Sequence, residues 1–350
     1  MHHNEQDFIT SILKNAQRLL IISLIIIVGF AFLMLDMANV LPKVFSDSDN
    51  KIANIEQPEV KAKNDFWSPP DISTIKDEAK KELVLKGKDL IQNTAKYFGP
   101  KGSVAHTSNG MNCQNCHLNA GTSIFGNNYG SVASTYPKLR SRSGTFETIP
   151  KRINDCFERS LNGSGLDTLS NEMLAMVSYM QFIGSDVERG KKAKGSGLKT
   201  IPFLDRAVDP EKGEKIYAAK CASCHMPNGE GQLTQEGNSY TYPPLWGPNS
   251  YNDAAGLYRI TNFAKYVKFN MPLGSTHESP QLTDEEAWDV AGFVNTRQRP
   301  QKRFPKDWPD ISKKPIDHPF GPYADAFPEK QHKLGPFGPI QEYYANKSQK

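Results

Sequence analysis

Cys113-Gln114-Asn115-Cys116-His117 decides the fold, and Cys221-Ala222-Ser223-Cys224-His225 repeats its pattern later in the chain. Two cysteines with two residues between them and a histidine directly behind are typical of covalent c-type haem attachment. The thiols add to the haem vinyl groups, and the histidine becomes the proximal iron ligand. Zinc is the alternative for any cysteine pair, but the histidine in the same place twice favours haem. The sequence therefore predicts two covalently attached haem c groups, held by Cys113, Cys116, His117, Cys221, Cys224 and His225.

Similar helical segments flank both motifs. Gly87-Lys-Asp-Leu-Ile, ahead of the first motif, matches Gly213-Glu-Lys-Ile-Tyr ahead of the second. Behind the motifs, Asn171-Glu-Met-Leu-Ala-Met-Val-Ser-Tyr-Met matches Glu285-Glu-Ala-Trp-Asp-Val-Ala-Gly-Phe-Val without a gap. Such internal similarity indicates two copies of one unit. The order of elements resembles class I cytochromes c, in which an opening helix crosses a closing helix beside the haem. We therefore expect an all-α protein with two such domains in tandem.

The 350 residues divide into segments by composition. The tail is rich in both prolines and aromatic residues, and because disordered segments are poor in aromatics, we expect it to wrap over one or both domains. The predicted segments are an N-terminal anchor or export signal (1–40), a tether (41–75), the first haem domain (76–184), a linker (185–206), the second haem domain (207–299) and an extended tail (300–350).

An apolar run from Leu19 to Leu35 is just long enough to span a bilayer as a helix. Lys14 and Arg18 precede it and Asp36 follows, which orients the N-terminus towards the cytoplasm. We expect an uncleaved anchor that holds the protein on the periplasmic side of the bacterial inner membrane. A cleaved export signal and a buried soluble helix are the alternatives. The net charge of +4 gives no reason to expect nucleic-acid binding.

The fifth cysteine, Cys156, belongs to neither motif. A helix that begins near Pro150 places an apolar stripe on one face, made of Ile149, Ile153, Phe157 and Leu161. Arg152, Cys156 and Ser160 form a parallel stripe on the same helix. Residues 138–159 hold six basic side chains against three acidic ones, and guanidinium groups suit oxyanions.

These neighbours predict a thiol at the iron that faces a pocket for a small dianion. A small buried hydrophobe is the alternative for Cys156, and a solvated face is the alternative for the basic residues.

The candidate for the distal ligand of each iron is the residue with a suitable side chain ahead of each closing helix. Met271 lies there in the second domain, and a thioether raises the potential of an electron-transfer haem. His277 is its competitor, although a surface histidine is the simpler interpretation. In the first domain the same place holds Cys156, with His106 as an alternative ligand. Three further methionines on the closing helix are expected in the core: Met173, Met176 and Met180.

Several segments together resemble one family, the dihaem thiosulfate dehydrogenases, also called tetrathionate reductases. The resemblance covers roughly residues 75–340, and the segment around Cys156 is its most specific part. The matching segments are Tyr136-Pro-Lys-Leu-Arg-Ser-Arg-Ser-Gly, Arg152-Ile-Asn-Asp-Cys-Phe-Glu-Arg-Ser-Leu-Asn-Gly, Tyr242-Pro-Pro-Leu-Trp-Gly-Pro, Asn270-Met-Pro-Leu-Gly, Phe304-Pro-Lys-Asp-Trp-Pro-Asp and Asp317-His-Pro-Phe-Gly-Pro-Tyr.

The resemblance implies that two thiosulfates and one tetrathionate interconvert with two electrons. It makes residues 76–184 the catalytic domain and residues 207–299 the electron-transfer domain. It implies that Cys156 is the axial ligand and reaction site, giving a His/Cys-ligated haem, and that Met271 completes a His/Met-ligated one. Some relatives carry lysine before that methionine, where this chain has Asn270. The implied substrate-binding residues are Arg142, Arg152 and Ser160.

The implied partners are thiosulfate or tetrathionate as substrate and a redox partner, either a small cytochrome c or a membrane electron carrier. Two other functions remain open at this point. One is a non-catalytic dihaem electron-transfer cytochrome. The other is a thiosulfate-conjugating cytochrome that acts on a cysteine of a carrier protein.

Overall fold

The computed structural model describes residues 17, 19–24, 26–27 and 65–347. By its contacts the chain forms two units, residues 1–64 and residues 65–350. Most of the predicted anchor (19–35) and the predicted tether up to residue 64 lie outside the described residues. Within the described part of the chain, no helix combines the length and the apolar character needed to cross a membrane.

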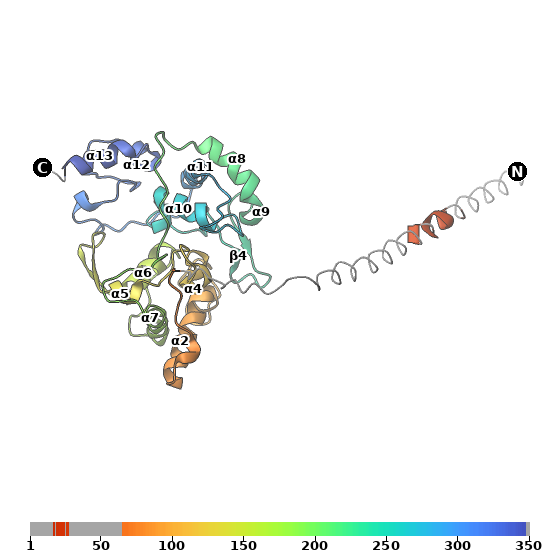
Figure 1. Cartoon of the computed structure of the whole chain (residues 1–350), viewed down its shortest axis with the longest axis horizontal. Helices are drawn as coiled ribbons and strands as arrows, with labels where there is room; N and C mark the ends of the chain where they lie inside the picture. Colours follow the sequence, from red (N-terminus) through yellow and green to blue (C-terminus); the bar gives the residue numbers. More distant parts are fainter. Residues whose placement is uncertain (1–16, 18, 25, 28–64, 348–350) are drawn as a thin grey trace, which may run out of the picture. The chain divides into compact units, whose positions relative to one another are not determined.

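The first haem domain is helical, as the sequence predicts (Figure 1). Its helices and 3-10 turns are η1 (Ile72–Thr74), α2 (Glu78–Gln92), α3 (Thr94–Phe98), η2 (Cys113–Asn115), α4 (Leu118–Gly121), α5 (Val132–Thr135), α6 (Ile149–Arg159) and α7 (Asn171–Ile183). The helical segment ahead of the first motif is divided into α2 and α3 at Asn93, whose backbone leaves the helical region. The side chain of Ser170 caps α7 by accepting from the amide of Met173.

The second haem domain repeats this arrangement. Its elements are α8 (Pro210–Lys220), α9 (Ala222–His225), η3 (Gly256–Tyr258), α10 (Ile260–Asn270) and α11 (Asp284–Thr296). Thr283 and Glu286 form a reciprocal capping box at the start of α11, which explains why the closing helix begins there. The 3-10 turn over residues 256–258 comes directly before α10.

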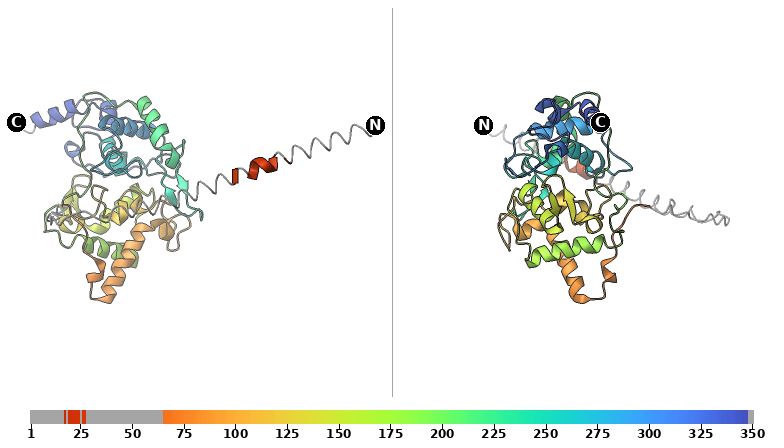
Figure 2. Two further views of the ribbon diagram at one scale, coloured as in Figure 1. Left: turned by 45° about the vertical axis from the view of Figure 1, so that its right-hand side comes forward. Right: turned by 90° about the vertical axis from the view of Figure 1, so that its left-hand side faces the viewer.

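The opening helix crosses the closing helix at a glycine in both domains (Figure 2). A Cβ on Gly87 of α2 would lie 2.0 Å from the carbonyl oxygen of Ala175 of α7. A Cβ on Gly213 of α8 would lie 2.0 Å from the carbonyl oxygen of Asp289 of α11. Ala175 and Asp289 are partners in the gap-free repeat. The structure therefore confirms the internal repeat at the level of individual contacts.

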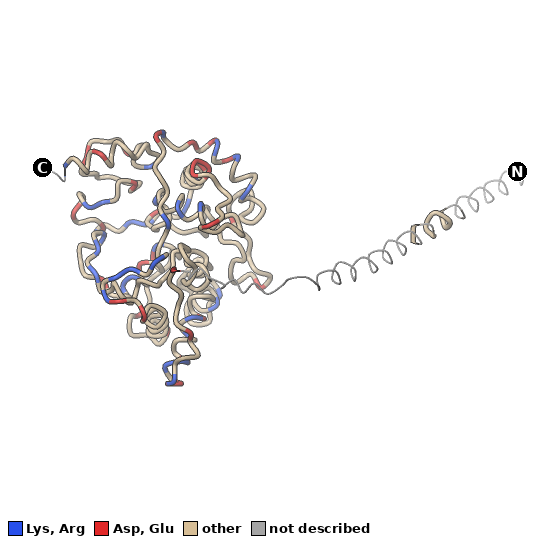
Figure 3. Tube along the Cα trace, in the orientation of Figure 1, with Lys and Arg blue, Asp and Glu red and all other residues tan. Residues whose placement is uncertain are grey.

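Two short antiparallel hairpins complete the domains. β1 (Lys138–Arg140) pairs with β2 (Thr145–Glu147) directly ahead of α6. β3 (Gln232–Leu233) pairs with β4 (Tyr240–Tyr242) in the second domain. The first hairpin is the one that matters for the site, because its strands deliver basic residues beside α6. In Figure 3 the trace next to α6 is rich in Lys and Arg.

The predicted linker lies along the first domain. The amide of Phe125 donates to the carbonyl of Gly195, and that of Asn127 donates to the carbonyl of Gly197. The hydroxyl of Ser134 donates to the carbonyl of Lys191 over 2.7 Å. Residues 191–197 therefore form a wall of the first domain.

Residues of the tail contact both domains. Asp307 accepts from Arg159 of α6, and the buried Asp317 accepts from Arg259 of the second domain. The sequence predicts an extended segment throughout, whereas residues 329–347 contain two helices, α12 (Glu329–Leu334) and α13 (Gly338–Lys347). An η4 turn (Ile311–Lys313) precedes them.

The two haem domains meet at the end of α6. Asn252, which has no exposed surface, donates through Nδ2 to the carbonyl of Glu158, and its amide donates to the carbonyl of Arg159. On the other side of the interface, the hydroxyl of Tyr266 donates to the carbonyl of Asn115. The loop that contains Asn252 and the helix that contains Tyr266 thus bind the end of α6 and the first attachment motif.

Candidate functional site

A cavity of about 290 Å³ lies at the centre of the first domain. It brings together residues of the first attachment motif and residues of the basic segment 138–159, which lie apart in the sequence. Its polar and reactive lining includes Cys113, Cys116, His117, Tyr136, Lys138, Arg152, Cys156, Ser160 and Lys192. The attachment motif and the helix that carries Cys156 thus face one common space.

The first attachment motif is arranged to receive haem. Nδ1 of His117 donates to the carbonyl of Asn127 over 2.5 Å, which leaves Nε2 to bind the iron. Burial lowers the pKa of His117 to about 4, so the imidazole is neutral, as an iron ligand must be. Burial raises the pKa of Cys113 and of Cys116 to about 12, and neither forms a disulfide.

The second motif repeats this geometry. His225 is buried at the end of α9, and its Nδ1 donates to the carbonyl of Pro243 over 2.8 Å. Burial lowers the pKa of His225 as well. A cluster of three rings packs in the same domain, from Tyr217 of the opening helix, Phe293 of the closing helix and Trp246 of the loop behind β4. In both domains the motif residues fit a covalently bound haem with a histidine ligand.

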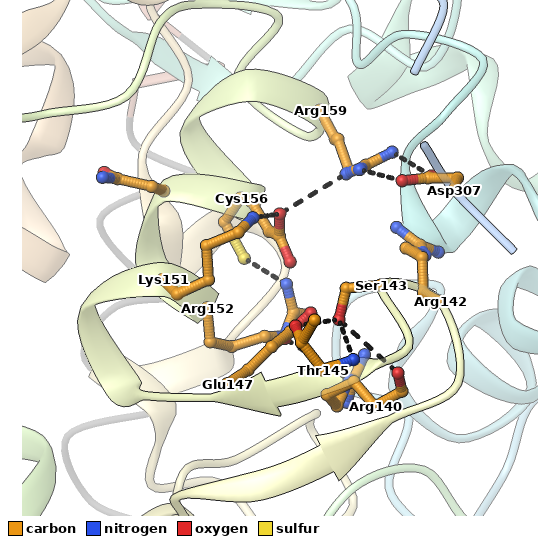
Figure 4. A network of polar contacts seen from close by, with 12 residues as sticks. Arg140, Arg142, Ser143, Thr145, Glu147, Lys151, Arg152, Cys156, Arg159 and Asp307 are labelled. Carbon is orange, nitrogen blue, oxygen red and sulfur yellow. Dashed lines mark hydrogen bonds and ion pairs between the residues drawn. The ribbon is translucent and has the colours of Figure 1, made fainter. Parts of the chain in front are cut away.

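Helix α6 has the two stripes that the sequence predicts. The apolar stripe is buried in full: Ile149, Ile153, Phe157 and Leu161. On the other stripe, Nη1 of Arg152 donates to Sγ of Cys156 over 3.2 Å (Figure 4). The negative charge of a Cys156 thiolate raises the pKa of Arg152. The thiol therefore lies inside the cavity, beside a permanent positive charge, with Ser160 one turn further along.

Arg142 lies apart from this pair. Figure 4 shows it on the side of Arg159 and Asp307 rather than beside Cys156. Its Nη1 donates to the carbonyl of Ala254 over 3.4 Å, and its guanidinium lies 5.6 Å from the ring centre of Trp308. Burial, with the nearby Arg159 and Arg152, lowers its pKa to about 10. Arg142 is therefore held by the second domain and the tail, and it is not among the residues that line the cavity.

A buried charge network fixes the far side of α6. Arg159 binds both oxygens of Asp307, at 2.8 and 2.9 Å, and stacks 3.7 Å from the ring centre of Phe304. Lys151 binds Asp155 at 2.6 Å, and Arg159 lies 3.8 Å from the same carboxylate. These contacts set the position and rotation of the helix that presents Cys156.

The other predicted ligand residues occupy varied surroundings. Met271 is half-buried directly behind α10, and His106 is exposed and outside the cavity lining. His277 packs edge-on against the rings of Phe66 and Phe125, so it is more enclosed than the surface histidine that the sequence suggested. The three methionines predicted for the core are buried on α7: Met173, Met176 and Met180.

Sequence reasoning missed two lysines of the cavity. Lys138 was counted only as one of six basic residues over 138–159, and Lys192 only as part of the linker. Both line the cavity with Arg152. The sequence held no signal for Lys192, because its position depends on how residues 191–197 bind to the first domain.

Comparisons with known proteins agree with this architecture. Residues 103–188 match the SoxA/TsdA cytochrome c domain family, and residues 210–298 match the cytochrome c family. The chain is 38% identical over 244 residues to the thiosulfate dehydrogenase of Psychrobacter arcticus, a match that covers 69% of this chain and 71% of that one. It is 36% identical over 253 residues to the thiosulfate dehydrogenase of Allochromatium vinosum, covering 71% and 88%.

A solved structure is also similar, that of thiosulfate dehydrogenase (TsdBA) from Marichromatium purpuratum in its "as isolated" form. The TM-score is 0.62 at 28% identity, over 72% of this chain and 52% of that chain, so the match spans about half of the solved protein. The two cytochrome c domains indicate two covalently bound haem c groups, as the motifs predict. From the identities to curated relatives over more than two thirds of both chains, the protein belongs to the thiosulfate dehydrogenase family.

Proposed function

We propose that this protein interconverts thiosulfate and tetrathionate, with Cys156 as the reaction site. The observation that carries the proposal is the Arg152–Cys156 contact of 3.2 Å inside the cavity that the first attachment motif also lines. The thiolate is the nucleophilic form of cysteine, and the guanidinium of Arg152 lies within hydrogen-bond distance of this sulfur. The same guanidinium suits an incoming sulfonate.

The chemistry at Cys156 takes two balanced steps. In the first, a sulfur–sulfur bond forms between the Cys156 thiolate and the outer sulfur of thiosulfate, and two electrons leave. In the second, the outer sulfur of another thiosulfate attacks that adduct, which releases tetrathionate and restores the thiolate. The haems, when bound, accept the two electrons one at a time and pass them on. Tetrathionate reduction follows the same steps in reverse.

We assign the remaining residues by their positions. His117 and Cys156 are the ligand pair for the first haem, and His225 and Met271 are the pair for the second. Arg152 and Ser160 face the substrate. Arg142 supports the site from the domain interface, where it contacts the carbonyl of Ala254 and the ring of Trp308.

The contact between α10 and the first motif supports an electron relay. The hydroxyl of Tyr266 donates over 3.0 Å to the carbonyl of Asn115, which lies between the two cysteines of that motif. Met271 directly follows the same helix. This helix therefore connects the first motif to the proposed ligand of the second haem. A small cytochrome c or a membrane electron carrier is the proposed redox partner.

The sequence pattern supports a location on the periplasmic side of the inner membrane, with residues 19–35 as an uncleaved anchor. Fractionation of cells that produce the full chain and a chain in which a cleavable export signal replaces residues 1–40 tests this proposal. Recovery of both chains in the soluble periplasmic fraction contradicts the anchor.

Variants of Cys156 test the proposed activity. Purified holoprotein is assayed for thiosulfate oxidation with an electron acceptor and for tetrathionate reduction with an electron donor. Cys156→Gly and Cys156→Met are expected to lose turnover while both haems stay attached, as measured by haem absorbance. Full activity in either variant contradicts the covalent scheme.

Two further results would replace the proposed function. If the unaltered protein turns over neither substrate, it is a non-catalytic electron-transfer cytochrome. If turnover requires a carrier protein with a cysteine, it is a thiosulfate-conjugating cytochrome.

A further inference from the structure

Three cationic side chains face the cavity of the first domain, and they come from three different segments. Arg152 lies on α6, Lys138 lies on strand β1, and Lys192 lies on the segment that follows the first domain. Arg152 already has Cys156 as its partner. Lys138 and Lys192 are therefore the cations of this cavity that the proposed function does not use.

The described residues that line the cavity include no carboxylate. Glu147, the nearby buried acid, lies 3.6 Å from Arg140 and opposite Lys138 in the hairpin, so it offsets part of the charge of both. Burial lowers the pKa of Lys138, and the positive charges of Arg140, Lys192 and Arg152 lower it further. The positive charges of Lys138, Arg140, Arg152 and Lys192 thus outnumber the nearby carboxylate of Glu147 at this wall, and an oxyanion in the cavity relieves the remaining repulsion.

The stoichiometry of the reaction needs such a second anion position. Two thiosulfate dianions must meet at one sulfur, and tetrathionate carries a sulfonate at each end. A single arginine beside the thiol can engage only one of these groups. The second one, if left in a half-buried cavity without a cation, would be costly to desolvate.

We propose that Lys138 and Lys192 form a second oxyanion subsite in this cavity, next to the one formed by Arg152. The proposal rests on the proposed function. Two oxyanions have the right chemistry for the subsite: the sulfonate of the second thiosulfate, and a propionate of the haem attached to Cys113 and Cys116. Both sources share a carboxylate- or sulfonate-like group that accepts from ammonium donors.

The test compares Lys138→Met and Lys192→Met with a matched control, Lys191→Met. Lys191 is exposed, adjacent to Lys192 and outside the cavity lining, so its replacement removes the same charge from the same surface. Haem content is checked first for each holoprotein. Equilibrium binding of tetrathionate is then measured by calorimetry, separately from turnover, together with the midpoint potential of the first haem between pH 5 and 9.

If a sulfonate occupies the subsite, each cavity variant binds tetrathionate about 10-fold more weakly than the control, as expected for loss of a charged hydrogen bond. KM rises in parallel, and the haem potential stays at the control value. If a propionate occupies it, binding is unchanged, while the potential of the first haem and its pH dependence differ from the control. Variants that match Lys191→Met in both measurements overturn the subsite.

The calorimetry also separates this proposal from the proposed function. If the unaltered protein binds tetrathionate but does not turn it over, the proposed activity is refuted. The comparison of the lysine variants in tetrathionate binding still decides whether the subsite exists. If Cys156→Gly loses turnover and Lys138→Met weakens tetrathionate binding as expected, the proposed function and the subsite are both supported.

Discussion

Asp307 binds Arg159 through both carboxylate oxygens and so joins the C-terminal tail to the helix that carries Cys156. The Arg159 side chain is only 5% exposed, and that of Asp307 is 21% exposed. A buried guanidinium without this partner keeps Asp155 at 3.8 Å as its remaining counter-charge. The tail is therefore part of the structure that supports the proposed reaction site.

Asp307→Asn is expected to lower the free energy of unfolding by about 3 kcal/mol, because it leaves Arg159 largely uncompensated in a buried place. Thermal unfolding followed by haem absorbance measures the change. Glu329→Gln, which breaks the exposed pair with Lys333, is the control and should cost less than about 1 kcal/mol. Equal effects of the two variants would refute the argument from burial.

Arg152→Met is expected to lower kcat/KM by about 10- to 100-fold, because it removes a charge-assisted hydrogen bond at the reacting sulfur. Arg152→Lys keeps the charge and should recover part of this loss, but not the fork geometry. Steady-state kinetics in both directions, at matched haem content, measure both variants. Unchanged kinetics for Arg152→Met would show that Arg152 does not take part in the reaction.

Gly213→Ala is expected to destabilise the second domain by about 1–3 kcal/mol or to prevent its folding, because the new Cβ meets the carbonyl of Asp289. Gly87→Ala should act in the same way on the first domain. Gly256→Ala is the matched control, since a Cβ there meets nothing within 4 Å. Unfolding temperature and haem content distinguish the three, and an unaffected Gly213→Ala would mean that the helices can separate at no cost.

Acid is expected to weaken the packing of the tail through His318. Burial lowers the pKa of this histidine from 6.5 to about 4, and its Nε2 accepts from Nε1 of Trp308. Below pH 6.5 the unfolded chain takes up a proton that the folded chain does not. Stability therefore falls between pH 6.5 and 4, by up to about 3 kcal/mol from this residue. His318→Gln should show a smaller loss of unfolding temperature over that range, and an identical pH profile would contradict the assignment.

Much of the fold could be predicted because both haem domains use local signals. Ser170 and Thr283 cap the closing helices with their own side chains, and the glycine of each opening helix marks the crossing. The stripe of Arg152, Cys156 and Ser160 follows from helical periodicity alone, and all three line the cavity.

The rest depends on contacts between residues far apart in the sequence. Residues 191–197 have a composition typical of a solvated linker, yet their carbonyls accept hydrogen bonds from the loop behind the first motif. The position of Arg142 depends on Trp308 and Ala254, which belong to the tail and the second domain. No local pattern encodes such long-range pairs, so neither the wall of the cavity nor the place of Arg142 could be deduced.

The crossing at Gly87 and at Gly213 also has an evolutionary consequence. Two copies of one scaffold keep the same contact between opening and closing helices, at equivalent residues. One difference between them lies in the segment before the closing helix, which presents Cys156 in one copy and Met271 in the other. A duplicated electron carrier could therefore acquire a reaction centre by altering that one segment, while its partner copy kept the ancestral task.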